Sequence, residues 1–154
     1  MKTKMILLAA AVVFGSAVVA SAQNPNMGTW KLNEAKSHFA KGATKNHTVV
    51  YEMAGDDIKV TVEGTDGGGN AVHSEWTGKF DDKYYAVTGD PSSDMRMYHR
   101  VNKHTLTIRA KKDGKVMLTG TITLSGNGKT RTVTTSGRNA QGRWITNAAV
   151  YDKQ

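Results

Sequence analysis

The sequence contains no cysteine among its 154 residues. This excludes a disulfide scaffold, and it also excludes a lipid anchor attached through a cysteine after export. The chain must therefore obtain its stability from side-chain packing and from hydrogen bonds between strands. Its length allows this, because a single domain of roughly 130 residues buries about two-thirds of the surface of its unfolded chain.

Motifs for hydrolytic and nucleotide chemistry are absent as well. No Gly-x-Ser-x-Gly nucleophile elbow occurs. The glycine-rich segment 66–70 lacks the following Lys-Ser/Thr pair of a phosphate-binding loop, so we interpret it as a hairpin turn. His73 and Glu75 share one strand face, which would suit an acid/base pair, but this face lies opposite Trp76 and is expected to be exposed. We therefore expect no catalytic residue and no enzymatic activity.

The histidines form no recognisable metal-binding pattern. No pair has one of the short spacings that are typical of zinc sites. The five histidines occupy positions 38, 47, 73, 99 and 104. We expect neither a metal nor a cofactor.

The only long apolar run lies near the N-terminus. Lys2 and Lys4 precede the run 5–14, and the small residues Ala20-Ser21-Ala22 follow it. This order is typical of a secretory signal peptide that is cleaved before Gln23. The alternative is an uncleaved anchor, since a membrane-spanning helix needs about 20 apolar residues. However, Gly15 and Ser16 interrupt the run, and no basic stop-transfer cluster follows it.

We therefore predict a signal peptide over residues 1–22 and one mature domain over residues 23–154. The mature domain is expected to be periplasmic or extracellular, soluble and monomeric, without an integral membrane span. Loss of Lys2 and Lys4 lowers the net charge from +8 to +6, with 19 basic and 13 acidic residues remaining. Such a surface attracts anions, but the densest basic run, 109–115, contains Asp113. We interpret the charge mainly as a source of solubility and expect no nucleic-acid partner.

Apolar and polar residues alternate with period two through most of the mature chain, which predicts β-strands. Turn residues such as Asp113-Gly114 and Asn127-Gly128 separate the strands and are typical of tight hairpins. A helical turn or two is expected over residues 34–41. No connection is long enough for a parallel crossover. The pattern predicts ten strands in an all-β, antiparallel, up-and-down β-barrel, because closure hides the edge strands.

The first predicted strand carries a motif that resembles a known family. Gly28-Thr29-Trp30 resembles the Gly-x-Trp start of the calycin superfamily, which includes the lipocalins and the intracellular fatty-acid-binding proteins. The chain as a whole is similar to small secreted bacterial lipocalin-like proteins of unassigned function. The resemblance implies a lipocalin-like barrel in which Trp30 closes one end, and it makes Gly28 and Trp30 the structural signature.

Two departures from the fatty-acid-binding proteins matter. Only residues 34–46 are available where those proteins place a pair of helices. Their Arg-x-Tyr carboxylate clamp lies late in the chain, whereas Arg96-Met97-Tyr98 has the spacing on an earlier strand. The last predicted strand offers Asn147 and Tyr151 but no central arginine. The clamp is therefore not transferred to this sequence.

The inward-facing apolar residues are the best functional candidates. With Ser74, Gly78 and Gly120 as small interruptions, they predict a cavity that holds a small apolar or amphipathic ligand. A barrel filled by its own side chains is the alternative. The candidate ligand-binding residues are Tyr51, Met53, Ser74, Trp76, Met95, Met97 and His99.

A second hypothesis is a protein-interaction or inhibitor module that acts through its loops or its basic outer face. Arg96, Tyr98 and Arg100 alternate with Met95, Met97 and His99 along one strand. If the methionine face points inward, the three other residues share an exposed face. They are the candidate contacts for a protein partner.

Overall fold

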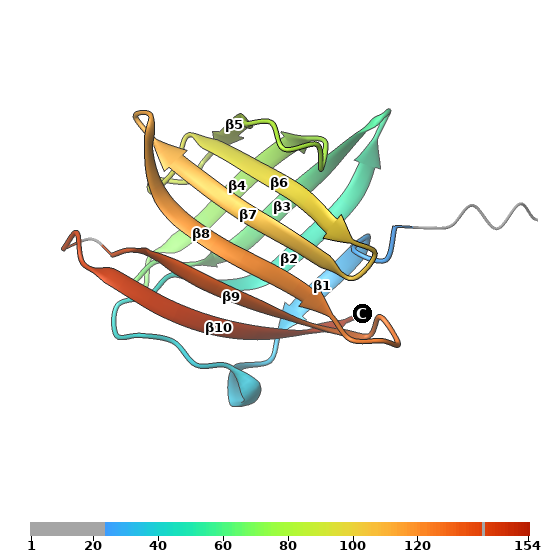
Figure 1. The fold of residues 1–154 in the computed structure, drawn as a ribbon. Helices are drawn as coiled ribbons and strands as arrows, with labels where there is room; N and C mark the ends of the chain where they lie inside the picture. The colour runs from blue at the N-terminus through green and yellow to red at the C-terminus, as the bar shows by residue number, and fades with distance from the viewer. Residues whose placement is uncertain (1–23, 140) are drawn as a thin grey trace, which may run out of the picture.

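The computed structural model describes residues 24–139 and 141–154, so the signal peptide predicted over residues 1–22 lies outside the described residues. The described part consists mainly of strands and their connections, with one short 3-10 helix (Figure 1). The elements are β1 (Gly28–Leu32), η1 (Glu34–Lys36), β2 (Lys45–Ala54), β3 (Asp57–Thr65), β4 (Ala71–Gly78), β5 (Tyr85–Thr88), β6 (Met95–Asn102), β7 (Thr105–Lys112), β8 (Lys115–Leu124), β9 (Thr130–Arg138) and β10 (Trp144–Lys153).

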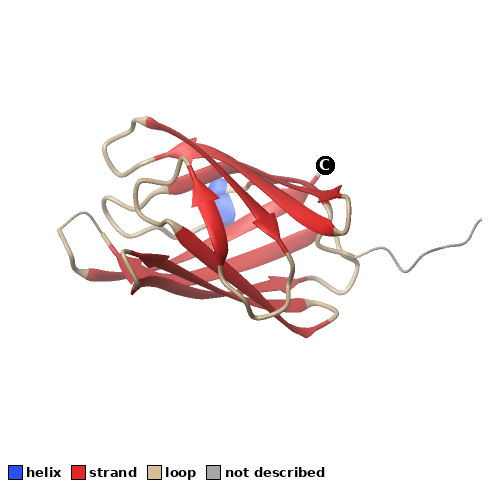
Figure 2. Cartoon of the chain, turned by 90° about the horizontal axis from the view of Figure 1, so that it is seen from above, coloured by secondary structure: helices blue, strands red, loops and turns tan. Residues whose placement is uncertain are grey.

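Each strand pairs antiparallel with its neighbours in the chain, and β1 also pairs with β10, which closes the barrel. The closing register sets Trp30 opposite Lys153 and Leu32 opposite Tyr151. Two views show the strands wrapping around a single barrel (Figures 1 and 2). The predicted all-β, up-and-down, lipocalin-like barrel of ten strands is confirmed. Closure satisfies the edge hydrogen bonds that an open meander would expose.

The hairpins follow the turn chemistry of the sequence. Asp113 and Gly114 both have positive φ, 49° and 76°, which the two-residue turn between β7 and β8 requires. The segment after β1 is less helical than predicted, since η1 covers only residues 34–36. The chain then returns to the barrel wall, where His38 pairs with Ala148 of β10. This pairing extends the barrel wall beyond the end of β1.

The alternating strand directions place the connections at two ends of the barrel. The Trp30 end holds residues 24–27 and the connections β2–β3, β4–β5, β6–β7 and β8–β9. The Phe39 end holds residues 33–44 and the connections β3–β4, β5–β6, β7–β8 and β9–β10. No helix in the described residues is long and apolar enough to cross a membrane.

Aromatic rings fill one side of the interior. The ring centroids of Trp76 and Tyr98 lie 4.8 Å apart, and both rings also contact Phe80. A Cβ atom added to Gly78 would collide with the ring of Tyr85. The small residue therefore leaves no gap here, because a neighbouring aromatic side chain occupies the space.

Candidate functional site

Strand β6 turns the opposite face inward from the one that the sequence predicted. Tyr98 is 2 % exposed and contacts the interior rings of Tyr51 and Trp76. The register with β7 is regular from Met95 to Arg100, so alternation places Met95, Met97 and His99 on the outer face. The prediction that these three side chains point into the barrel is therefore wrong, although Met97 is only 5 % exposed on that outer face.

The same finding overturns the proposed outer patch on β6. Arg96 and Tyr98 lie inside, and Arg100 lies at the Trp30 end with its guanidinium 5.6 Å from the Phe80 ring centroid. Arg96 forms an ion pair with Asp90 at 3.1 Å, and both side chains are largely buried. This pair attaches the β5–β6 connection to the inner wall. Of the three residues only Arg100 is exposed, so they do not form a shared exposed surface for a protein partner.

The other predicted ligand-binding residues separate into two groups. Tyr51, Ser74 and Trp76 face inward, but all three are at most 3 % exposed, so neighbouring side chains cover them. Met53, predicted to face inward, is 59 % exposed at the end of β2. The seven predicted residues therefore do not form one site.

Solvent reaches the interior on the side opposite the aromatic rings. Val133 pairs with Ile122 and Ala149, which both belong to the core, yet Val133 itself is only partly buried. Other inward side chains on β7 to β10 are also only partly buried, while their inward neighbours nearer the Trp30 end are buried. We call the partly buried set the lumen face: Ile108, Leu118, Val133, Thr135, Ile145 and Asn147.

A buried arginine lies beyond the lumen face, at the Trp30 end. Arg131 is 2 % exposed, and it occupies the next inward position after Val133 on β9. Its guanidinium lies 4.9 Å from the ring centroids of both Tyr51 and Tyr151. Among the described residues, its Nε and Nη1 atoms have no hydrogen-bond partner. Two buried donors are thus available to an acceptor.

These surroundings change the acidity of the neighbouring phenols. Burial raises the pKa of Tyr151 to about 12, although the guanidinium of Arg131 acts in the opposite direction. Burial also raises the pKa of Tyr98, and the nearby Tyr51 adds to this effect. Both phenols therefore stay neutral over the physiological range, and they can donate hydrogen bonds there.

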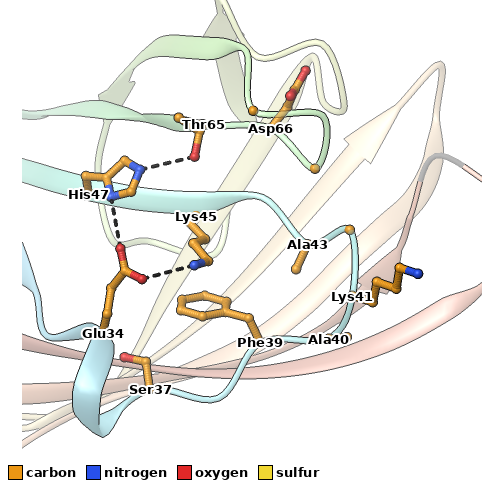
Figure 3. Close-up of a pocket in the computed structure, with 13 residues that line it drawn as sticks. Glu34, Ser37, Phe39, Ala40, Lys41, Ala43, Lys45, His47, Thr65 and Asp66 are labelled. Atoms are coloured by element: carbon orange, nitrogen blue, oxygen red, sulfur yellow. Dashed lines mark hydrogen bonds and ion pairs between the residues drawn. The ribbon is translucent and has the colours of Figure 1, made fainter.

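A cleft of about 590 Å³ lies at the Phe39 end, between segment 34–43, the start of β2 and the β3–β4 connection (Figure 3). The Phe39 ring forms its apolar part, and the ammonium group of Lys45 lies 5.4 Å from the ring centroid. Ala40, which also lines the cleft, donates its backbone N–H to the side chain of Asn147 on the lumen face. Segment 34–43 thus lies between the cleft and the lumen face.

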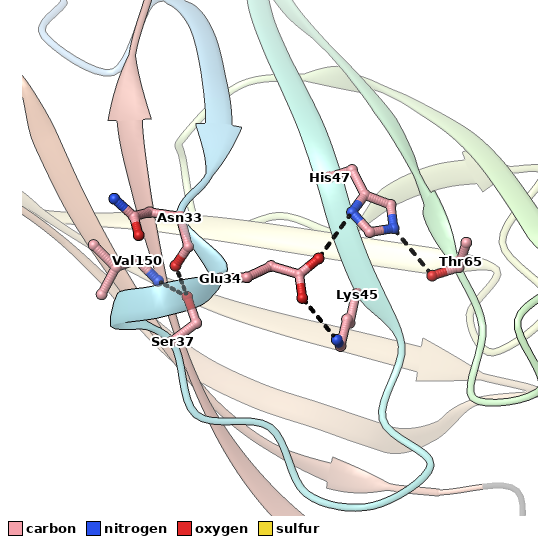
Figure 4. Close-up of polar contacts among 7 residues, drawn as sticks. All are labelled: Asn33, Glu34, Ser37, Lys45, His47, Thr65 and Val150. Atoms are coloured by element: carbon pink, nitrogen blue, oxygen red, sulfur yellow. Dashed lines mark hydrogen bonds and ion pairs between the residues drawn. The ribbon is translucent and has the colours of Figure 1, made fainter.

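Polar contacts hold this segment against β2 and β10 (Figure 4). Glu34 accepts a hydrogen bond from Lys45 at 3.0 Å and lies 3.9 Å from the Nδ1 atom of His47. The Nε2 atom of His47 lies 3.1 Å from the hydroxyl of Thr65. On the other side, the hydroxyl of Ser37 accepts a hydrogen bond from the N–H of Val150 at 2.9 Å. These contacts make segment 34–43 part of the barrel wall.

Gly28 and Trp30, the structural signature predicted from the resemblance, lie on β1. Trp30 is fully buried, and its indole N–H donates to the carbonyl of Asn26 at 2.9 Å. Gly28 has a φ of +111°, and a Cβ atom there would lie 3.0 Å from the Cε atom of Lys153. Only glycine meets both conditions without strain.

Comparison with known proteins assigns no family to this chain. No family model matches the sequence. A search of curated proteins also finds no match. The functional argument therefore depends on the fold and on the interior of the barrel.

Proposed function

We propose that the protein binds one small apolar or amphipathic molecule inside the barrel, against the lumen face. The observation that supports this proposal is the uneven exposure of inward side chains. On β7 to β10 the side chains of the lumen face are partly exposed although they face inward, whereas inward neighbours on the same strands, such as Ile122 and Ala149, are buried. A concave, mostly apolar surface with a few polar groups is typical of small-molecule sites.

The ligand's polar group is proposed to be acidic. The buried donors of Arg131 lack a partner, and a carboxylate would satisfy them with charge-assisted hydrogen bonds. Thr135 and Asn147 add neutral polar groups nearer the Phe39 end. With the predicted signal peptide, this makes the protein an exported, non-enzymatic, lipocalin-like carrier of the periplasm or the extracellular space.

Displacement of a neutral fluorescent naphthylamine probe tests the proposal. The variant Val133→Trp is expected to fill the lumen and to abolish probe binding, since the added ring occupies the same volume. Overpacking costs about 1–3 kcal/mol, so the variant is expected to remain folded by circular dichroism. Thr134→Trp is the matched control, because Thr134 is exposed on the outer face of the same strand.

The control variant is expected to bind the probe as the unchanged protein does. Equal binding by both tryptophan variants would contradict an internal site. Native mass spectrometry of protein purified from its own compartment gives an independent measurement. A ligand-free spectrum together with no probe binding would refute the proposal.

A further inference from the structure

Positive charge at the Phe39 end is concentrated on two of its connections. The β7–β8 tip (residues 111–116) and the β9–β10 tip (residues 138–144) together carry five basic residues and one acidic residue, Asp113. A second carboxylate, that of Asp94 on the β5–β6 connection, accepts a hydrogen bond from the N–H of Asp113 at 2.8 Å. The three other connections at this end, 33–44, 66–70 and 89–94, carry two basic and four acidic residues. The five basic residues are Lys111, Lys112, Lys115, Arg138 and Arg143.

The two tips belong to neighbouring hairpins of the barrel. Strands β8 and β9 pair directly, and Leu118–Gly137 is the last pair before the strands continue separately into the two tips. Figure 1 shows the orange β7–β8 tip and the red β9–β10 tip projecting at the same end of the barrel. Both sets of charges therefore lie at the Phe39 end, beside the strands that carry the lumen face, and the two tips project apart from each other (Figure 1).

The same tips expose apolar side chains. Trp144 is 50 % exposed and Val116 is 40 % exposed, and they are two of the few large hydrophobic residues on the described surface. The guanidinium of Arg138 lies 5.1 Å from the Trp144 ring centroid. An exposed tryptophan with adjacent cations matches a lipid interface, where the indole lies at headgroup level and the cations meet anionic lipids.

We propose that the β7–β8 and β9–β10 tips dock the Phe39 end of the barrel on an anionic lipid surface. Charge complementarity supports this partner, and the exposed indole supports a bilayer over a purely polar polyanion. The inference stands on surface residues alone and does not require a ligand in the lumen. If both proposals hold, docking brings the lumen-face side of the barrel close to the membrane.

Sedimentation with lipid vesicles tests the proposal, using the mature chain. Vesicles that contain phosphatidylglycerol are expected to bind the protein, and pure phosphatidylcholine vesicles are not. Binding is expected to disappear at high salt, because salt screens exposed charges. Binding should shift the tryptophan emission to the blue. Trp30 and Trp76 are already buried, so the shift reports Trp144.

The variant Lys115→Gln/Arg143→Gln removes one exposed cation from each tip. Each cation contributes about 1 kcal/mol at an anionic surface, so binding is expected to weaken by about thirtyfold. The matched control, Lys103→Gln/Lys129→Gln, removes two exposed cations from hairpins at the Trp30 end. It is expected to bind the vesicles nearly as the unchanged protein does.

Three outcomes would overturn the proposal. Equal weakening by both double variants would indicate diffuse attraction by net charge. Equal binding to both kinds of vesicle would exclude recognition of anionic headgroups. Binding of a duplex oligonucleotide with a Trp144 emission shift, but without vesicle binding, would replace the lipid surface with nucleic acid.

Discussion

The guanidinium of Arg131 lies 4.7 Å from the ring centroid of Trp30, and both side chains are almost fully buried. This contact spans β10 and joins β9 to β1 through the interior at the Trp30 end. The rings of Tyr51 and Tyr151 complete an aromatic enclosure around the cation. Arg131 thus packs among the aromatic rings of the core, and two of its hydrogen-bond donors have no partner among the described residues.

Replacing Arg131 by Met is expected to change the free energy of unfolding by no more than about 1 kcal/mol. Burial of an ion costs several kcal/mol, whereas each cation–π contact returns about 0.5–2 kcal/mol, so the two effects nearly cancel. The variant is expected to lose affinity for a medium-chain fatty acid but not for the alcohol of equal chain length. Urea unfolding and probe displacement measure the two effects. A loss of stability above about 3 kcal/mol would contradict this balance.

Replacing Gly28 by Ala is expected to destabilise the barrel by about 1–3 kcal/mol, because the residue has a positive φ and the new methyl group approaches Lys153. Gly55→Ala is the matched control. Gly55 also has a positive φ, +65°, but no atom lies within 4 Å of the added Cβ position. We expect a smaller loss for the control in urea unfolding. Equal losses would show that the contact with Lys153 has no effect.

Alkaline pH is expected to destabilise the protein through Tyr151. The folded pKa of about 12 exceeds the ordinary value of 10, so the unfolded chain releases this proton first. Stability is therefore complete below pH 10 and falls as the pH rises toward 12, by about 3 kcal/mol for this group. Tyr151→Phe is expected to flatten the dependence in urea unfolding between pH 9 and 12. An unchanged slope would assign the effect to other groups.

Glu63 is expected to control the titration of His73 on the outer face. Its hydrogen bond raises the pKa of His73, with a smaller contribution from the charge of Glu75. The stabilisation is present below the ordinary histidine pKa, and it disappears as the pH rises through the raised pKa. Glu63→Gln is expected to lower the pKa of His73 in an NMR titration. Glu52→Gln on β2 serves as the control, and an equal shift in both variants would contradict the pairing.

Much of the barrel could be predicted from the sequence, because strands and hairpins depend on local properties. Alternation placed Val60 and Val62 inside, and Asp113-Gly114 specified a tight turn. The inward orientation of Arg131 could also have been predicted from the sequence. Leu124 faces inward and pairs with Arg131 across the β8–β9 hairpin, so counting residues from the Asn127-Gly128 turn predicts an inward arginine. The general rule that charged residues lie on the surface argued against an inward Arg131, so this residue is not among the candidates predicted from the sequence.

The orientation of β6 could not be read from its own residues. Both of its faces carry large side chains, and hydrophobicity alone favoured the face with Met95 and Met97. The tertiary structure reverses this, because the Tyr98 ring packs edge-to-face against Trp76 and Tyr51 from other strands. The buried Arg96 is tolerated because Asp90, on a separate connection, neutralises its charge.

The sequence by itself therefore determined the strands, the turns and the closed antiparallel topology, since these follow from alternation and turn chemistry along the chain. Only the tertiary structure decided which face of β6 points inward, that the Tyr85 ring fills the space at Gly78, and that solvent reaches the interior along β7 to β10. The physical reason is that packing across a barrel joins residues that are distant in the sequence, and a local pattern contains no information about their fit.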